Sequence, residues 1–172
     1  MASEELLVHL VPPPWRDQME VPDWSAVHEQ MGMELPSDYR WLVERYGPGT
    51  FDEFLHVFQP GASADAIRLE HQAERVAWAL NYLRERGENI PYVESELIPV
   101  ATDDNGDTCF LLCRPAEDPD LWTVVINEAR GPRWESFDGG LTDFIYAALS
   151  RNRRFTLFPE DFPGDEPTFS PY

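Results

Sequence analysis

The chain has 172 residues, of which 42% are hydrophobic and 13% aromatic, so it can fill the core of one domain but is short for two. Thirteen Lys and Arg residues stand against 32 Asp and Glu residues, which gives a net charge of −19 at pH 7. Such a surface repels phosphate backbones and anionic lipids and attracts basic proteins; the alternative is that the acidity serves solubility alone.

The N-terminal stretch lacks the features of a secretion signal. Its only apolar run, Leu6 to Val11, is short and follows Glu4 and Glu5 instead of basic residues. No run in the chain approaches the ~20 apolar residues that a membrane-spanning helix needs. The triple proline Pro12–Pro14 favours irregular structure over residues 1–21. We therefore expect a cytoplasmic protein that does not contact membranes.

Three helices are predicted in the first half of the folded region. Trp24 to Met31 has the pattern of a short helix, and Leu35 to Gly47 that of a clearer one, ended by Gly47 and Pro48. The longest helical pattern runs from Ala64 to Arg86 and is ended by Gly87. Between the second and third helices, residues 51–58 are expected to form short extended structure.

The second half of the chain changes to the alternating period of strands. Four short strands are predicted: Leu97–Ala101, Thr108–Arg114, Trp122–Asn127 and Arg133–Phe137. Asn105-Gly106, between the first two, is the pair preferred by a type I′ hairpin turn. A last helix follows Gly139-Gly140. Helices that bracket successive strands predict an α+β fold, with a mostly antiparallel sheet packed with helices in a single domain.

Residues 151–172 form a proline-rich segment. Four prolines recur at every fourth position, which excludes a helix and predicts an extended C-terminal arm. Its aromatic residues are too many for a free linker, so the arm is expected to pack on the domain, with docking on a partner as the alternative. The aromatic residues are Phe155, Phe158, Phe162, Phe169 and Tyr172.

The two cysteines are predicted to be free thiols. Cys109 and Cys113 lie four residues apart in one predicted strand, which separates them by roughly 13 Å. A disulfide needs Cα atoms within about 7 Å of each other. The two side chains should therefore lie unpaired on one face of the strand.

Searches for chemical sites give negative results. Asp103, Asn105 and Asp107 match the first three ligand positions of a calcium loop, but Thr108 replaces its glycine and Arg114 its final glutamate. No zinc-ligand spacing, phosphate-binding loop or nucleophile elbow is found. We therefore predict no catalytic centre, no metal and no cofactor.

Two other groups of side chains have competing interpretations. The basic cluster Arg151, Arg153 and Arg154 ends the last helix, where cations complement the helix dipole, and is too small for a nucleic-acid site. Tryptophan is enriched at binding interfaces but is more often part of a core. Both interpretations apply to Trp41, Trp78, Trp122 and Trp134, and for Trp122, within an apolar run, we favour the core.

Several segments, in this order, resemble the SUKH superfamily: LPSDYRWLVERYGPGTF (Leu35–Phe51), FLHVFQP (Phe54–Pro60), LIPVATDDNGD (Leu97–Asp107), WTVVINE (Trp122–Glu128) and WESFDGGLTDFI (Trp134–Ile145). The resemblance runs from about Val21 to Leu149 and outlines a SUKH-like domain at residues 22–150. It implies an α+β fold in which a sheet is backed by helices.

The resemblance also implies a function. It points to a non-catalytic immunity protein that binds and neutralises a cognate bacterial toxin, or, alternatively, to a regulatory or scaffolding module of the same fold. Partner contacts vary with the toxin, so no binding residue is carried over from the family. From charge and position we predict that a basic toxin domain contacts the turn residues Asp103, Asp104 and Asp107 and the loop residues Glu117, Asp118 and Asp120.

Overall fold

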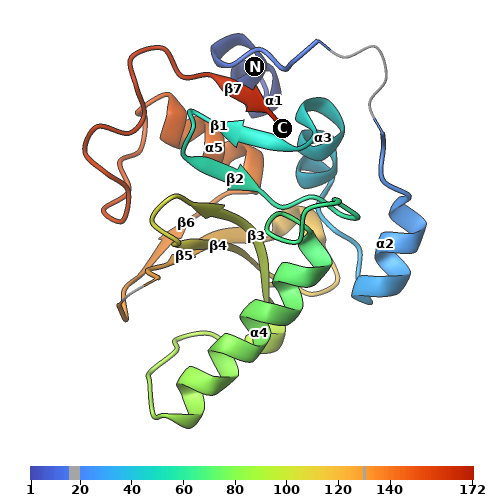
Figure 1. The fold of residues 1–172 in the computed structure, drawn as a ribbon, viewed down its shortest axis with the longest axis vertical. Helices are drawn as coiled ribbons and strands as arrows, with labels where there is room; N and C mark the ends of the chain where they lie inside the picture. The colour runs from blue at the N-terminus through green and yellow to red at the C-terminus, as the bar shows by residue number, and fades with distance from the viewer. Residues whose placement is uncertain (16–19, 130) are drawn as a thin grey trace.

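The structure is a computed structural model that describes residues 1–15, 20–129 and 131–172. Over these residues the chain forms one domain with seven strands in a single sheet, in the order β6-β5-β4-β3-β2-β1-β7. Every neighbouring pair of strands is antiparallel (Figure 1). The α+β fold with an antiparallel sheet and packed helices is thereby confirmed.

The elements have the following bounds. The helices are α1 (Ser3–Leu10), α2 (Trp24–Met31), α3 (Ser37–Tyr46), α4 (Leu69–Glu85) and α5 (Leu141–Leu149), with 3-10 turns η1 (Glu94–Glu96) and η2 (Pro119–Leu121). The strands are β1 (Gly49–Phe51), β2 (Leu55–Val57), β3 (Leu97–Asp103), β4 (Thr108–Leu112), β5 (Thr123–Asn127), β6 (Trp134–Phe137) and β7 (Phe169–Pro171).

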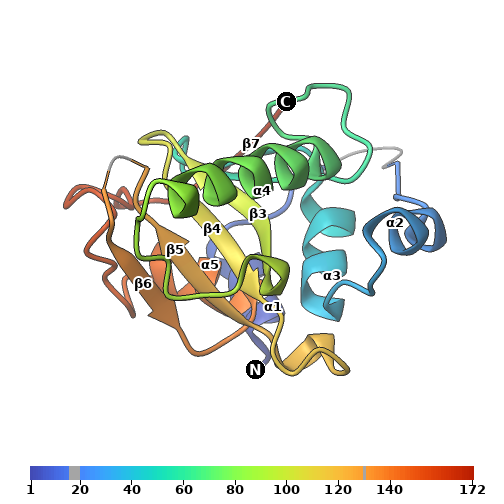
Figure 2. The same cartoon turned by 90° about the horizontal axis from the view of Figure 1, so that it is seen from below.

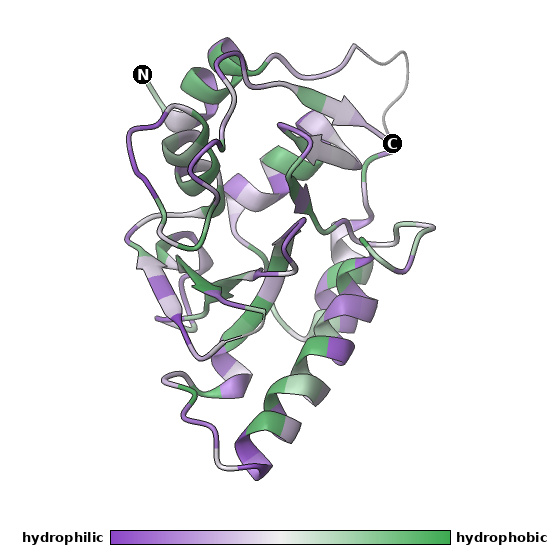
Figure 3. Ribbon diagram, turned by 60° about the vertical axis from the view of Figure 1, so that its left-hand side comes forward, coloured by the Kyte–Doolittle hydropathy of each residue, from purple (hydrophilic) through white to green (hydrophobic). Residues whose placement is uncertain are grey.

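Helices cover the two faces of the sheet unequally. Residues of α1, α3 and α5 join one face of the sheet in the main core, whereas α4 lies on the other face over a smaller cluster (Figure 2). Alternation along β4 divides its side chains between the two, with Leu111 in the main core and Phe110 under α4. Figure 3 shows hydrophobic and hydrophilic residues alternating along α4, as expected for a helix with one side in solvent.

The prediction of an irregular N-terminal segment is wrong where α1 forms. This helix packs on α5, with Leu7 and Val11 fully buried. The Tyr46 hydroxyl donates a hydrogen bond of 2.7 Å to the Val11 carbonyl. Eight residues are too few for a helix that is stable alone, so tertiary packing, which the local pattern does not report, holds α1 in place. Residues 16–19 of the same predicted segment lie outside the described residues.

The other predicted helices form, and two of them begin later than predicted. The second predicted helix begins at Ser37, directly after Pro36. The third begins at Leu69, five residues later than Ala64, because the preceding residues turn to bond with Gln59. The Gln59 amide donates to the Ile67 carbonyl, and the Gln59 carbonyl accepts from the Leu69 amide.

The C-terminal arm packs on the covered face of the domain. The Phe155 ring lies 4.8 Å from that of Phe144, and the Phe169 ring lies 4.8 Å from that of Phe51. The last residues form β7, which pairs with β1 and was not predicted. Pro171 is tolerated there because β7 is an edge strand.

Both cysteines are free and buried, as predicted. Cys109 lies in β4 and Cys113 one residue beyond it, and both belong to the main core, so they point to the same side of the sheet. Burial raises the pKa of the Cys113 thiol to about 12. The thiols therefore act as small apolar side chains.

Candidate functional site

The β3–β4 turn is the first of the two acidic segments proposed from the sequence. Asp103 and Asp107 are only 4% and 5% exposed, whereas Asp104 is exposed. Asp103 Oδ1 accepts hydrogen bonds of 2.9 Å from the Asn105 and Asp107 amides, and Asp107 Oδ1 accepts one of 2.9 Å from the Ala129 amide. The expected exposed acidic turn is therefore wrong for two of its three carboxylates, because these accept hydrogen bonds from backbone amides within the fold.

The same bonds decide the turn type. Gly106 has a φ of +86° but Asn105 does not have a positive φ, so the predicted type I′ turn does not form. The Gly106 amide instead donates to the Asp103 carbonyl, three residues back. The side chain of Asp103 bonds both amides of the loop and thereby fixes a longer turn.

The ionised form of the Asp103 carboxyl group is disfavoured at its position in the turn. Burial raises its pKa to about 7, and the nearby charge of Asp107 adds to this effect, while backbone hydrogen bonds oppose it. Its Oδ2 atom is buried without a hydrogen-bond partner. The turn is thus a structural element with a titratable group in it and not an open contact surface.

The β4–β5 loop holds the second acidic segment. Glu117 and Asp118 are exposed, as a contact surface requires. Asp120 Oδ1 accepts a hydrogen bond of 2.7 Å from the Ser37 amide at the start of α3, and this bond lowers its pKa. The β4–β5 loop follows β4 and the β3–β4 turn precedes it, so the two acidic segments lie at opposite ends of one strand and do not form a single site.

Asp120 also borders a hollow where three helices begin. The first turns of α1, α3 and α5 line it, with the carboxylates of Glu4, Asp38 and Asp143. Asp38 Oδ2 accepts a hydrogen bond of 2.9 Å from the Thr142 amide. Carboxylates at helix N-termini complement the helix dipoles, so the arrangement stabilises the fold. Across the described residues, no group of three His, Cys, Asp or Glu side chains is placed to hold a metal ion.

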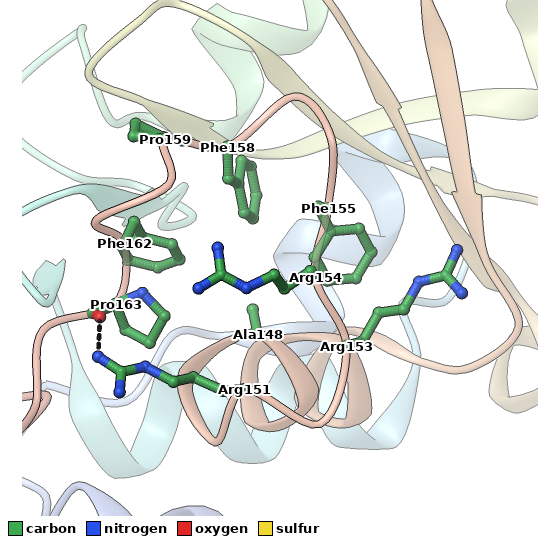
Figure 4. Close-up of a pocket in the computed structure, with 9 residues that line it drawn as sticks. All are labelled: Ala148, Arg151, Arg153, Arg154, Phe155, Phe158, Pro159, Phe162 and Pro163. Carbon is green, nitrogen blue, oxygen red and sulfur yellow. Dashed lines mark hydrogen bonds between the residues drawn. The ribbon is translucent and has the colours of Figure 1, made fainter.

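The three arginines after α5 hold the C-terminal arm. Arg151 Nη2 donates to the Pro163 carbonyl at 2.8 Å, and Arg154 Nη1 donates to the Glu160 carbonyl at 3.1 Å. Figure 4 shows the Arg154 side chain among the rings of the arm. The cavity between the arginines and the rings of the arm has a volume of about 10 Å³, enough for about one water molecule. The arginines therefore do more than complement the helix dipole, and their spacing in the sequence did not reveal this role.

An exposed row of side chains runs along α4 on the side away from the sheet. We call it the α4 column: Trp78, Tyr82 and Arg86. Trp78 is 70% and Tyr82 45% exposed. Their rings stack at 5.6 Å with an interplanar angle of 10°, and Arg86 lies 5.6 Å above the Tyr82 ring. A core position for Trp78 is therefore wrong, whereas Trp122 is buried as predicted.

A cleft lies beside the column, between the C-terminal half of α4 and the hairpin of β5 and β6. This α4 cleft has a volume of about 680 Å³. Its apolar lining includes Leu80, Leu83, Ile90 and Trp134, and among the residues that the structure describes its charged lining residues are Glu88 and Glu128. Sequence reasoning missed the cleft because distant segments form it; the one available signal was a tryptophan at position 134.

Local backbone geometry places Glu88 at the cleft. Gly87, with a φ of +87°, ends α4, and the Glu88 amide donates to the Leu83 carbonyl five residues back. On the opposite wall, Arg133 Nη2 lies 2.7 Å from Glu128 Oε1, which lowers the pKa of Glu128. Trp134 is fixed by ring contacts to Tyr92 and Phe110. The cleft is therefore formed without a partner.

Comparison with known proteins assigns the family. The SMI1 / KNR4 family (SUKH-1) matches residues 22–143, from just before α2 into α5. The chain belongs to this SUKH-1 family. The resemblance noted in the sequence is confirmed, and the α4 column and α4 cleft both lie within the matched region. The family is generally associated with non-catalytic immunity proteins of toxin–immunity systems.

One further comparison and one property of the helices bear on the function. A search among curated proteins found no match. Among the helices of the described residues, none has the length and apolar character to cross a bilayer. The family assignment is thus the principal external guide to what the protein does.

Proposed function

We propose that the chain is a bacterial immunity protein that works in the cytoplasm by binding and neutralising a cognate toxin domain, without catalysis. The observation that carries the proposal is the SUKH-1 match over residues 22–143, which includes six of the seven strands. A binding role also agrees with the surface of α4, where large side chains are exposed beside an open cleft. These are features of contact surfaces.

The toxin domain in this proposal is basic. A net charge of magnitude about 2–8 is enough to keep a small domain soluble, and this chain carries −19. Some of this charge is structural, since Asp103, Asp107 and Asp120 bond backbone amides. The rest forms a field that attracts a basic protein, such as a toxin that itself grips nucleic acid. Association should accordingly slow as salt is added.

The test measures whether the chain protects cells from the toxin, and how many molecules of the chain are needed to inhibit one toxin molecule. Where a toxin domain is encoded beside this gene, it is expressed alone and together with the chain, and cell survival is compared. The purified chain is then titrated into the toxin's own activity assay. A binding inhibitor protects up to one toxin molecule per chain, whereas an enzyme that modifies the toxin protects at far lower ratios. Protection well below equimolar amounts, or no protection and no binding, would contradict the proposal.

The alternative is a regulatory or scaffolding module of the same fold with no toxin partner. An exposed aromatic pair on α4 would serve such a module equally well. The neighbouring genes distinguish the two functions. A neighbouring gene for a secreted chain with a toxin domain would support the immunity function, and unrelated neighbouring genes would support the regulatory one.

A further inference from the structure

We propose that the α4 column and the α4 cleft together form the docking surface, and that they take a basic segment of a partner protein whose cationic side chains have apolar neighbours. The proposal rests on the proposed function only in identifying that partner as the toxin. It uses neither acidic segment chosen from the sequence as the contact. The β3–β4 turn adjoins the cleft through the bond from Ala129 to Asp107 but is mainly buried, and the other segment lies at the far end of β4.

The first step is that the α4 column is not needed to hold α4 in place. The helix already buries Val76 and Leu80 against the sheet. Trp78 and Tyr82 point the other way, and their contact is with each other and with Arg86. Tryptophan, tyrosine and arginine are the residue types most enriched among interface hot spots. Eight residues of helix separate the ends of the column by about 12 Å, the reach of a short docking segment.

The second step is that column and cleft are continuous. Leu83 lines the cleft, and Arg86, the residue that follows α4, donates its amide to the Leu83 carbonyl, so the two are neighbours at the end of the helix. The loop after α4 continues the wall with Glu88 and Ile90. The C-terminal half of α4 and this loop extend beyond the sheet in Figure 1, which leaves them open to a partner.

The third step is the charge of the cleft. Among the described lining residues, the two charged ones, Glu88 and Glu128, are carboxylates, and the side-chain oxygens of Asn89 and Asn127 add hydrogen-bond acceptors. Arg133 is the cation paired with Glu128, while the apolar floor contains Trp134. Lysine and arginine side chains combine an apolar stem with a cationic head, and a cation is attracted to an aromatic face. Glu128 is already paired with Arg133, so Glu88 supplies the negative charge for a partner's cationic head. A basic protein segment therefore fits this lining better than nucleic acid does.

The test uses matched pairs of variants and two probes. Trp78→Ala and Glu88→Lys alter the proposed surface. Leu121→Ala removes another exposed apolar side chain, and Glu117→Lys makes the same charge reversal elsewhere. Leu121 is a suitable match because it is 60% exposed, and Glu117 is exposed like Glu88. All four should melt as the wild type does. The probes are an inactivated toxin domain from the neighbouring gene and a synthetic peptide of arginine and leucine, with a glutamate and leucine peptide as its control.

We expect Trp78→Ala and Glu88→Lys each to weaken toxin binding about tenfold or more, and the control variants to change it less than about twofold. In indole NMR spectra, the basic peptide should shift the resonances of Trp78 and Trp134 and leave that of Trp122 in place, while the acidic peptide shifts none. Ultracentrifugation tests whether a second copy occupies the surface: a dimer that Trp78→Ala dissolves would overturn the proposal.

The outcomes separate this proposal from the proposed function. If the chain binds and neutralises the toxin but Glu117→Lys, and not Glu88→Lys, weakens binding, the docking surface is overturned and the immunity function stands. If no toxin is bound but the basic peptide shifts Trp78 and Trp134, the function fails and the docking surface stands. If neither resonance moves and no toxin is bound, both fail.

Discussion

The two faces of the sheet differ in how completely they are covered. On one face, α1, α3, α5 and the C-terminal arm pack into the main core, where Tyr39 and Phe144 are fully buried. On the other, α4 covers a small cluster around Phe110 and leaves a cleft and a stacked aromatic pair in solvent. We infer that the covered face supplies most of the stability and that the α4 face is available for contact. Substitutions on the two faces should therefore have opposite profiles.

The largest expected effect comes from removing the arm. Deleting residues 155–172 removes Phe155, Leu157 and Phe158 from the main core, and burial of each such side chain contributes about 1.5–3 kcal/mol. The free energy of unfolding should fall by roughly 5 kcal/mol or more, which urea denaturation measures. Deleting Tyr172 alone is the control, because this residue is largely exposed. An unchanged melting temperature after the full deletion would show that the arm does not belong to the core.

A single core substitution gives the next largest effect. Phe144→Ala removes a fully buried ring that contacts Phe137, Phe155 and Phe158, and should destabilise the protein by about 3–5 kcal/mol. Trp78→Ala, on the α4 face, should change stability by only about 0.5 kcal/mol. Denaturant midpoints of the two variants test the comparison directly. Similar losses in both would mean that the α4 face is as stabilising as the covered one.

The helices and strands that form the two faces could be predicted from the sequence only in part. The period of Tyr39, Leu42, Val43 and Tyr46 predicted α3 and its buried side, since helical spacing is a local property. By contrast, β7 pairs with β1 over more than a hundred residues, and its three residues have no pattern of their own. The sequence missed β7, whereas residues 51–58, which were expected to be extended, contain β2 and the end of β1. All three are three-residue strands, and their places in the sheet depend on distant partners.

The candidate site was less predictable than the fold. Charge and turn pattern suggested that Asp103 and Asp107 are exposed, but whether a carboxylate faces solvent depends on which backbone amides lie within reach. Here the Ala129 amide, from a different hairpin, meets Asp107. The side of α4 that Trp78 occupies is different, because the spacing of Val76 and Leu80 marks the buried side and places Trp78 opposite to it. The contact of Asp107 is tertiary, so no local rule contains it.

A third prediction concerns pH. The pKa of Asp103 is about 7 in the folded protein and near 3.8 when unfolded, so the folded state binds the additional proton between these values. Stability should therefore fall as the pH rises from about 4 to 7, and level off above. One pKa unit corresponds to about 1.4 kcal/mol, so even half of this shift gives about 2 kcal/mol.

The test of this effect is Asp103→Asn, which removes the titration and keeps a side-chain oxygen for the Asn105 and Asp107 amides. The difference in unfolding free energy between variant and wild type should grow between pH 4.5 and pH 7.5 in favour of the variant. Asp118→Asn, at an exposed carboxylate, is the control, and the trend with pH should be larger in Asp103→Asn than in this variant. A difference that is flat with pH would mean that Asp103 titrates normally.

The smallest expected effect distinguishes two carboxylates of the β4–β5 loop. Asp120 bonds the Ser37 amide and so fixes the start of α3 on the covered face, whereas η2 follows Asp118 without a side-chain cap bond. Asp120→Ala should cost about 1 kcal/mol, as loss of a helix cap does, and Asp118→Ala less than about 0.5 kcal/mol. Each variant removes one negative charge, so a difference between them in denaturant midpoint reports the hydrogen bond and not the charge. If the partner binds on the α4 face, both variants should also bind it with nearly wild-type affinity. A marked loss of affinity in Asp118→Ala would instead show that the partner contacts the β4–β5 loop.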